Sequence, residues 1–518
     1  MPISRGFDAI HGMQTDPPLD QMPKNVVRRI IDFLPEFQFL TIARGAWTYL
    51  TGALAHVGSD TYSWMTYCPF GGGSKLVMSS PSSNGITWVN DLSAAATGTV
   101  LSTAFLSGPF TPPIFHRTPA GGLLIAPWAG TGNRPRKYDG SAAPADLGGT
   151  PPVARLAASW GDYLLLANGN APNQNRIWFS AVGNPESWDT AANGGWLDVP
   201  GAIQAVVPKG NTIFVFTDQA VHLIVGDDPP FTNHLGNLTQ RKFAFTEGIG
   251  KGISGTGAEA VVTYKDFVIW ANANGVWKSD GGQPIDLTKQ GGIKSYWPFV
   301  YRPQAGYRVA VGTYRSYLFV TVVQGASWTS WRTLIYDLEN NTWWEWSNVP
   351  GTHLTHIPPD FNVREDLLVI DRPNNKVGSI AYAFNAYAAA GDDNLTTKQP
   401  TIVTGAYRFG TLGQKRIRRG FITSKVENGA SLQVGFITPP DQFVQAGSDP
   451  TSVPGQVTTL TISGSPTNAS KNLRTPLRID RRCELIQAYL VGFGCVGVAG
   501  LDFEATPYDP VRDGDART

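Results

Sequence analysis

The sequence predicts an all-β protein, a β-propeller of about seven blades with a C-terminal β-sandwich module. Three observations predict this fold. Turn-forming and aromatic residues are abundant in a chain of low charge. A two-strand pattern recurs with the period of propeller blades, about 40 to 50 residues. This period is lost near Leu395, where longer strands begin.

The composition favours short strands over helices. The 518 residues include 57 glycines, 38 prolines and 16 tryptophans, and only 16% are charged, whereas about 25% is usual in soluble domains. Glycine and proline form tight turns, and aromatic residues favour strands. This composition excludes coiled coils, helical bundles and disordered scaffolds.

The repeated pattern is a turn, a first strand of apolar or β-branched residues, a second turn and a second strand. Seven first strands follow one another along the chain and predict seven blades. Six and eight blades are the alternatives, because the ends of the array are not sharply marked in the sequence. Their separations fit four-stranded blades. They are GGGSKLVMSS from Gly71, AGGLLIAP from Ala120, WGDYLLLAN from Trp160, KGNTIFVFTD from Lys209, YKDFVIWAN from Tyr264, YRSYLFVTV from Tyr314 and VREDLLVID from Val363.

Antiparallel partners follow most of these strands within the reach of one turn, as a blade requires. Several are preceded by Asn, Asp or Gly, which tolerate the left-handed dihedral angles of hairpin turns. The partners are GITWVND after Asn84, RIWFSAVG after Asn175, AVHLIVGD after Gln219, GVWKSDGG after Asn274, RTLIYDLENNTWWEW beginning at Trp331, and GSIAYAFN after Val377.

These patterns divide the chain into four parts: an N-terminal segment at 1–45, the propeller at 46–394, the β-sandwich at 395–508 and a polar tail at 509–518. Within the first part, NVVRRIIDFLPEF is compatible with either a short helix or a strand. In the sandwich, AYLVGFGCVGVAGL is too short to span a bilayer and is interrupted by glycines, so it predicts a buried β-hairpin. No other stretch is apolar enough to predict a membrane-spanning segment.

Charge is unevenly distributed along the chain. The net charge is +1, yet residues 398–482 contain twelve basic and four acidic residues. A basic module on a mildly acidic body predicts an interface with an acidic protein surface or with DNA phosphate, and a solvated strand face is the alternative. The candidate residues are Arg408, Lys415, Arg416, Arg418, Arg419, Lys425, Arg478, Arg481 and Arg482.

Strand alternation in QKRIRRGF places Lys415, Ile417 and Arg419 on one face. The same alternation places Arg416 and Arg418 on the opposite face. Contact with protein is the favoured interpretation of this basic strand.

Tryptophans cluster in the hairpin IYDLENNTWWEW. Trp343 and Trp346 are expected in the wedge between blades, and Trp344 is expected to point the opposite way and be exposed. An exposed ring of this kind could stack on a sugar.

No catalytic, cofactor-binding or metal-binding residues are predicted. The three cysteines, Cys68, Cys483 and Cys495, form no CxxC pair and have no histidine at ligand spacing. His353 and His356 lie in GTHLTHIPPD, where the prolines forbid a regular helix, so a polar loop is expected.

Several phrases resemble the nozzle or hub proteins of short-tailed phages, the tail tubular protein B family. They are NRIWFSAVGNPESW at 175–188, the opening DPPLDQMPKNVVRRIIDFLPEFQFLTIARGAWTYL with Arg44-Gly45, and the closing GQKRIRRGFI and GLDFEATPY. The resemblance implies a homohexameric ring in the virion tail, assembled in the host cytoplasm. Its implied partners are a tail adaptor or portal-side ring, fibres or spikes, and genome DNA in transient, non-specific contact.

The alternative is a soluble propeller that binds glycans or acts as a glycoside hydrolase similar to sialidases. The best match to the sialidase Asp box is Gly85-x-Thr87-Trp88, with Pro81 and Ser83 where Ser and Asp are needed. Hairpin chemistry alone explains such a remnant, because glycine makes the turn while Thr and Trp pack on the sheet.

Overall fold

The computed structural model covers residues 1–518. It describes residues 3–8, 10, 12–18, 21–22, 26–36, 40–43, 48–49, 64–80, 85–89, 99–102, 113–119, 121–128, 134–189, 194–218, 220–230, 235–242, 257–302, 307–323, 331–347, 351, 353–358, 365–371, 376–380, 400–408, 414–438, 443, 458–465, 473–493 and 496–507.

Seven four-stranded blades form a closed ring in the described part of the chain, so the predicted propeller is confirmed. The innermost strand of each blade contacts that of the next, and the seventh contacts the first. These inner strands are β8 (Trp64–Phe70), β12 (Ile114–Thr118), β16 (Ala154–Trp160), β20 (Ile203–Lys209), β24 (Val261–Tyr264), β28 (Arg308–Tyr314) and β32 (Leu354–Ile357).

The apolar runs predicted as first strands are the second strands of their blades. They are buried on both faces, as their continuous apolar sequence requires, and each pairs with an inner strand that the repeat pattern did not include. They are β9 (Gly73–Ser80), β13 (Gly121–Ala126), β17 (Tyr163–Gly169), β21 (Thr212–Thr217), β25 (Phe267–Asn272), β29 (Tyr317–Val323) and β33 (Asp366–Asp371).

The outer half of each blade is antiparallel as well. The third strands are β10 (Gly85–Val89), β14 (Arg136–Tyr138), β18 (Arg176–Phe179), β22 (Val221–Val225), β26 (Gly275–Ser279), β30 (Trp331–Asp337) and β34 (Lys376–Ser379). The fourth strands are β11 (Thr99–Ser102), β15 (Ala145–Asp146), β19 (Gly195–Asp198), β23 (Thr239–Lys242), β27 (Ile285–Asp286), β31 (Thr342–Ser347) and, from the N-terminal segment, β7 (Thr48–Tyr49). The seventh blade is therefore completed by residues far from it in sequence, through Gly378 opposite Tyr49.

Short helices connect some blades. The α-helices α1 (Leu287–Gln290) and α2 (Trp297–Val300) follow the fifth blade, and two 3-10 turns lie at Asn173–Asn175 and Ala258–Ala260. Asp286 caps α1 by accepting a hydrogen bond from the Lys289 amide. None of the helices in the described ranges is long and apolar enough to cross a membrane.

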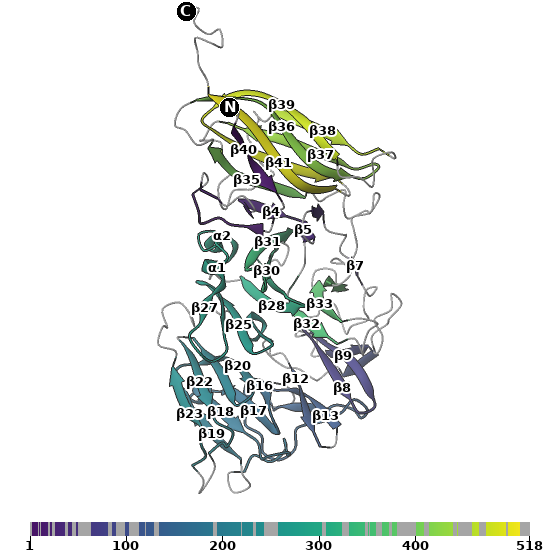
Figure 1. Cartoon of the computed structure of the whole chain (residues 1–518). Coiled ribbons are helices and arrows are strands. Elements are labelled where there is room, and N and C mark those ends of the chain that lie inside the picture. The colour runs from purple at the N-terminus through teal and green to yellow at the C-terminus, as the bar shows by residue number, and fades with distance from the viewer. Residues whose placement is uncertain are drawn as a thin grey trace, which may run out of the picture.

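The C-terminal module is a sandwich of two sheets that also contains the N-terminal segment. One sheet contains β39 (Leu473–Cys483), β36 (Lys415–Val426), β41 (Val496–Pro507), β6 (Leu40–Ala43) and β5 (Phe33–Glu36), with β1 (Ile3–Asp8) on β41. The other contains β4 (Arg29–Ile31), β35 (Thr401–Arg408), β40 (Leu485–Phe493), β37 (Ser431–Ile437) and β38 (Thr458–Ser463). Figure 1 shows this sandwich above the blades, with β4 and β5 between the two bodies.

The structure decides one alternative in the sandwich and overturns one prediction. The segment NVVRRIIDFLPEF, left open between helix and strand, forms β3 (Val26–Val27), β4 and β5. The predicted hairpin AYLVGFGCVGVAGL is wrong, because β40 pairs with β35 and β37 whereas β41 pairs with β36 in the opposite sheet. Both strands are apolar because both sheets contribute to one core, in which Phe436 and Phe503 meet edge to face at 5.7 Å.

The propeller and the sandwich share a sheet. Strand β31 of the sixth blade pairs in parallel with β4, through Glu345 opposite Ile31, and this bond joins the blade to the second sandwich sheet. The short strand β2 (Gly12–Met13) pairs with β31 and β3 at the same place. The result is an eleven-stranded sheet that runs from the propeller into the sandwich.

Candidate interface on the sandwich

The basic candidate residues gather at one end of the β39–β36–β41 sheet. Arg416 lies opposite Arg482, and Arg419 lies opposite Arg478. This end of the sheet holds the first residues of β1 and β36 and the last residue of β41, since Ile3 pairs with Ala505 and Lys415 with Pro507. Seven described arginines lie toward this end: Arg408, Arg416, Arg418, Arg419, Arg478, Arg481 and Arg482.

Lys415 does not belong to this surface, so its prediction as an interface residue is wrong. Only 2% of Lys415 is exposed. It is the first residue of β36 and lies between Cys483 of β39 and Pro507 of β41. Lys415 lies on the same face of β36 as Ile417, which belongs to the hydrophobic core of the sandwich.

The face predicted for Arg419 is also wrong. The register of β36 shifts between Ile417 and Arg419 against both neighbouring strands, which is the signature of a β-bulge. After the shift, Arg418 and Arg419 are both exposed, and Gly420 faces the core. Asp480 on β39 has a positive φ of 40°, so the partner strand is irregular at the same level. The bulge therefore adds an arginine to the outer face.

Carboxylates neutralise part of this surface. Arg416 Nε donates to Asp480 Oδ1 at 2.9 Å, and Arg419 Nε donates to Glu504 Oε2 at 2.6 Å. Hydrogen bonding from Arg416 lowers the pKa of Asp480, and the charges of Arg418 and Arg482 act in the same direction. A carboxylate surrounded by several cations indicates that the local potential is positive.

Further along β36 the surface changes character. The Arg474 guanidinium lies over the Phe421 ring at 4.3 Å from its centroid and 3.7 Å from Asp502. Lys425 lies 3.5 Å from Glu427. Both of these described cations have a carboxylate nearby, so the basic character of the described surface concentrates at the opposite end of the sheet, around Arg418 and Arg482.

Trp344 is not exposed, so the prediction of an exposed ring that could stack on a sugar is wrong. Trp343, Trp344 and Trp346 are all completely buried, which confirms the core interpretation for the other two. Trp344 packs edge to face on Tyr317 at 5.6 Å. Trp344 belongs to a hydrophobic core cluster that includes residues of both the propeller and the sandwich.

The opposite face of β31 is covered too. Trp343 donates from Nε1 to the Leu287 carbonyl at 3.1 Å, and Gly291 approaches its ring so closely that a Cβ there would lie 2.3 Å from Trp343 Cδ1. The helical segment after the fifth blade therefore covers the side of β31 that the strand pattern left unassigned.

His356 lies in strand β32 and His353 directly precedes it, so the prediction of a polar loop is wrong. His356 belongs to β32 and its Nε2 lies 2.7 Å from Glu365 Oε1. His353 Nε2 bonds the Met65 carbonyl of the first blade at 2.9 Å, and burial lowers its pKa to about 4. In the described ranges no three His, Cys, Asp or Glu side chains come together to hold a metal ion.

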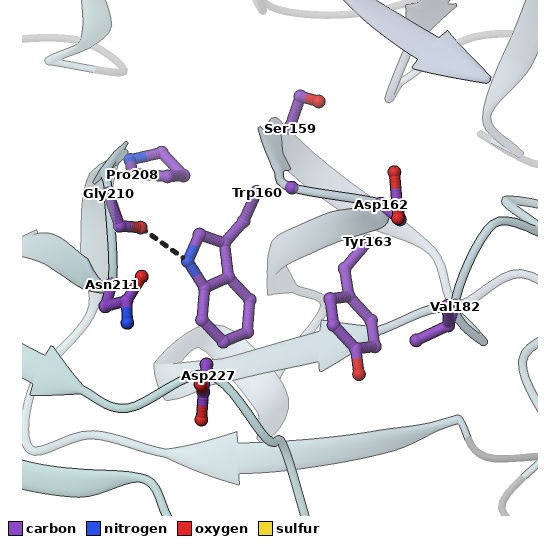
Figure 2. A pocket seen from close by; sticks show the side chains of 10 residues that line it. Ser159, Trp160, Asp162, Tyr163, Val182, Pro208, Gly210, Asn211 and Asp227 are labelled. Carbon is purple, nitrogen blue, oxygen red and sulfur yellow. Dashed lines mark hydrogen bonds between the residues drawn. The ribbon is translucent and has the colours of Figure 1, made fainter. Parts of the chain in front are cut away.

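The sequence argument missed a hollow on the propeller. The turn of WGDYLLLAN, already singled out as a repeat, carries Trp160 and Tyr163 on either side of Gly161-Asp162, and these side chains line a cavity of about 420 Å³ with residues of the fourth blade. Two aromatic residues flanking a two-residue turn are the only sequence signal for it. Figure 2 shows the residues that line this cavity.

Comparisons with known proteins give distant structural likenesses only. No protein family and no curated protein matches the sequence. A crystal structure of BBS1N in complex with ARL6DN is 14% identical with a TM-score of 0.40, covering 65% of this chain and 97% of that chain. The CNH domain of AfRom2 is 10% identical with a TM-score of 0.38, covering 65% and 99%. The N-terminal domain of Nup159 is 8% identical with a TM-score of 0.35, covering 68% and 98%.

Proposed function

We propose that this chain is a non-enzymatic structural protein of a phage virion, which assembles into a six-membered nozzle or hub ring of the tail. The ring would serve as a channel or plug for genome DNA during ejection and as a platform for an adaptor and fibres. The observation that carries the proposal is the continuous connection between the propeller and a sandwich with a one-sided basic surface.

The connection supports this role because a ring subunit must hold distant contact surfaces in a fixed relation. One sheet runs from the sixth blade into the sandwich. Beside it, Arg29 Nη2 lies 3.1 Å from Glu345 Oε2, and both side chains are 5% exposed. A shared hydrogen-bonded sheet and a buried ion pair resist hinge motion far better than a flexible linker.

The basic surface supports assembly through charge. Residues 398–482 carry a surplus of eight positive charges, so the rest of a chain with net charge +1 carries −7. A neighbouring ring with an acidic surface would be attracted to the arginine end of the sandwich, and charge complementarity would set the orientation of the contact. Contact with protein is favoured over a DNA-lining role, since phosphate contacts would slow the passage of DNA.

Electron microscopy of the purified protein and a charge-reversal variant of the basic surface test the proposal. Purified protein should form rings in negative-stain images, and tail particles should contain it. The double variant Arg418→Glu/Arg478→Glu should abolish ring stacking or adaptor contact at physiological salt while leaving the circular dichroism spectrum unchanged. Lys265→Glu, an exposed hairpin-turn charge on the fifth blade, is the matched control and should behave like wild type. A wild-type monomer that is missing from virions would overturn the proposal.

The same double variant separates the two possible uses of the basic surface. If the arginines contact protein, the variant loses the neighbouring ring and DNA release is unaffected. If they line the channel, rings and adaptor contact persist, while salt-dependent retention of double-stranded DNA falls.

A further inference from the structure

The hollow at the third and fourth blades is built from two hairpin turns on one face of the propeller. One turn joins β16 to β17 and carries Asp162 and Tyr163, and the other joins β20 to β21 and carries Asn211. Asp227, at the end of β22, and Val182 complete the wall. Its volume of about 420 Å³ lies within the range of small-molecule sites, about 300–1,000 Å³.

The aromatic part of the wall is held rigidly. Trp160 and Tyr163 stack at 5.4 Å between ring centroids with an interplanar angle of 24°. Trp160 also donates from Nε1 to the Gly210 carbonyl at 3.0 Å, the contact drawn in Figure 2, which ties the third blade to the fourth. Only 5% of Trp160 is exposed, so Tyr163 presents the aromatic surface of the cavity. Such a preformed wall costs little entropy when a ligand binds.

The polar part of the wall offers carboxylates, an amide and a phenol. Asp227 is oriented by Asn237, whose Nδ2 donates to Asp227 Oδ1 at 2.6 Å. Burial raises the pKa of Tyr163, and the charges of Asp228, Asp227 and Asp162 raise it further. The phenol is therefore neutral at physiological pH and able to donate a hydrogen bond into the cavity. Among the described residues that line this hollow there is no lysine or arginine.

A second hollow lies beside the first. Its volume is about 720 Å³, and the neighbouring residues Val182 and Gly183 line the first and second hollow respectively. It is also lined by the hairpin turns of the first two blades and by Lys137 and Glu186, which form an ion pair at 2.8 Å. The two hollows together offer an extended binding surface across four consecutive blades.

We propose that these adjoining hollows bind a neutral, linear saccharide, one sugar unit of which lies against Tyr163. The apolar C–H face of a pyranose packs on an aromatic ring, whose face is electron-rich. Its hydroxyl groups donate to Asp162 and Asp227 and accept from Tyr163 and Asn211. A uronic acid polymer would be repelled by the carboxylates, so the site selects neutral sugars. This proposal does not depend on ring assembly, since one chain contains both hollows.

Binding to a glycan array and saturation-transfer NMR test the proposal with defined probes. The probes are maltohexaose, cellohexaose, laminarihexaose and chitohexaose, with hexagalacturonate as the charged comparison. Wild-type protein should bind at least one neutral hexamer, and the corresponding monosaccharide at least tenfold more weakly, with no binding of hexagalacturonate. Failure to bind any neutral probe or any neutral glycan of the array would overturn the proposal, as would preferential binding of hexagalacturonate.

Three variants locate the site. Asp162→Asn keeps the size and the acceptor oxygen of an exposed turn residue while removing its charge, and we expect about a fivefold loss of affinity, because a hydrogen bond to a charged acceptor is about twice as strong as one to a neutral acceptor. Tyr163→Leu should lose at least tenfold. Asp266→Asn changes the equivalent turn position of the fifth blade, which lies outside the lining of both hollows, and should bind like wild type. Thermal unfolding confirms that each variant folds.

The competing occupant is a cationic side chain, which the carboxylates and the aromatic pair would also attract. N-acetylarginine amide serves as the probe. If it binds and is lost in Asp162→Asn, while no neutral sugar binds, the cavity recognises cations and the saccharide proposal is wrong. If a neutral hexamer binds and N-acetylarginine amide does not displace it, the proposal stands. Ring assembly is unaffected by these variants, so failure of the assembly proposal would be seen separately.

Discussion

Replacing Arg29 by methionine should loosen the junction between the propeller and the sandwich. Glu345 is 4% exposed and receives hydrogen bonds from two side chains, Arg29 at 3.1 Å and the Tyr296 hydroxyl at 2.8 Å. Arg332 in turn donates to the Tyr296 oxygen at 2.8 Å. Methionine keeps the length of the side chain and removes its charge, so the substitution leaves a buried carboxylate without its cation.

The expected cost is about 3–5 kcal/mol, because breaking a buried ion pair by removing one partner leaves an uncompensated charge. The Arg29 guanidinium also lies 5.2 Å from the centre of the Tyr296 ring, a contact worth about 0.5–2 kcal/mol that is lost as well. A cost of 3 kcal/mol corresponds to about two orders of magnitude in the opening equilibrium. Adding Glu345→Leu to Arg29→Met should recover most of it, since an apolar pair replaces the ion pair.

Hydrogen exchange at the junction measures this cost locally. The Asp32 amide donates to the Glu345 carbonyl at 2.9 Å, so its exchange rate reports the opening of β4 from β31. Arg176→Met is the matched control, because Arg176 pairs with Asp198 at 2.7 Å in a setting where the two side chains are 26% and 44% exposed. That variant should cost no more than about 1 kcal/mol. The reasoning would be refuted if Arg29→Met and Arg176→Met lowered the free energy of opening equally. It would also be refuted if Arg29→Met/Glu345→Leu were as destabilised as Arg29→Met.

Two further predictions concern the propeller. His353 bonds the Met65 carbonyl where the seventh blade meets the first, and burial lowers its pKa to about 4. Between pH 6.5 and 4, His353 is therefore protonated in the unfolded chain and neutral in the folded chain. The free energy of unfolding should therefore decrease as the pH is lowered through this range, by at most about 3 kcal/mol. This pH dependence, measured by urea unfolding, should be weaker in His353→Asn and unchanged in His356→Asn. Trp344→Ala should lower the free energy of unfolding by about 3–5 kcal/mol, because its ring is completely buried. Trp196 is 46% exposed, so Trp196→Ala should lower it far less in the same thermal unfolding assay. Similar losses in the two variants would contradict the burial of Trp344.

The second strands of the blades were predictable because they are buried on both faces and read as continuous apolar runs. Strand β25, with Val268, Ile269 and Trp270 all completely buried, is an example. The inner strands were missed because they face a crowded axis and alternate small or polar residues with apolar ones. In β16 burial alternates strictly from Ala154 to Trp160, but two of the four buried residues are alanines, so the alternation gives little hydrophobic contrast in the sequence.

The errors at the candidate site have specific physical causes. Alternation assumes a regular pleat, and the bulge after Ile417 breaks it, so Arg419 emerges on the outer face. Lys415 and Trp344 were assigned to exposed positions because a single strand cannot reveal which neighbours cover it. The strands that pair beside them, β41 and β4, lie more than 80 and 300 residues away along the chain. Non-local pairing of this kind is not encoded in local periodicity.

The N-terminal segment gives the last prediction, because it completes both bodies. Strand β7 closes the seventh blade, while β4, β5 and β6 extend the two sheets of the sandwich. Ile30 and Phe33 from this segment are completely buried, and burying each such side chain contributes about 1.5–3 kcal/mol. The isolated fragment 395–508 should therefore bind the dye ANS and unfold without cooperativity, and a peptide spanning 26–43 should restore a cooperative transition.

A peptide of the same composition in scrambled order is the control for that rescue. Should fragment 395–508 unfold cooperatively by itself at the temperature of the intact chain, the N-terminal strands would be an accessory to an independent domain. The expected dependence has a structural consequence: the same N-terminal segment closes the ring of blades through β7 and contributes β4 to the eleven-stranded sheet, so neither body can be completed without the strands that join it to the other. Closure and connection are therefore coupled, and a substitution that detaches β4 should also weaken the seam of the propeller.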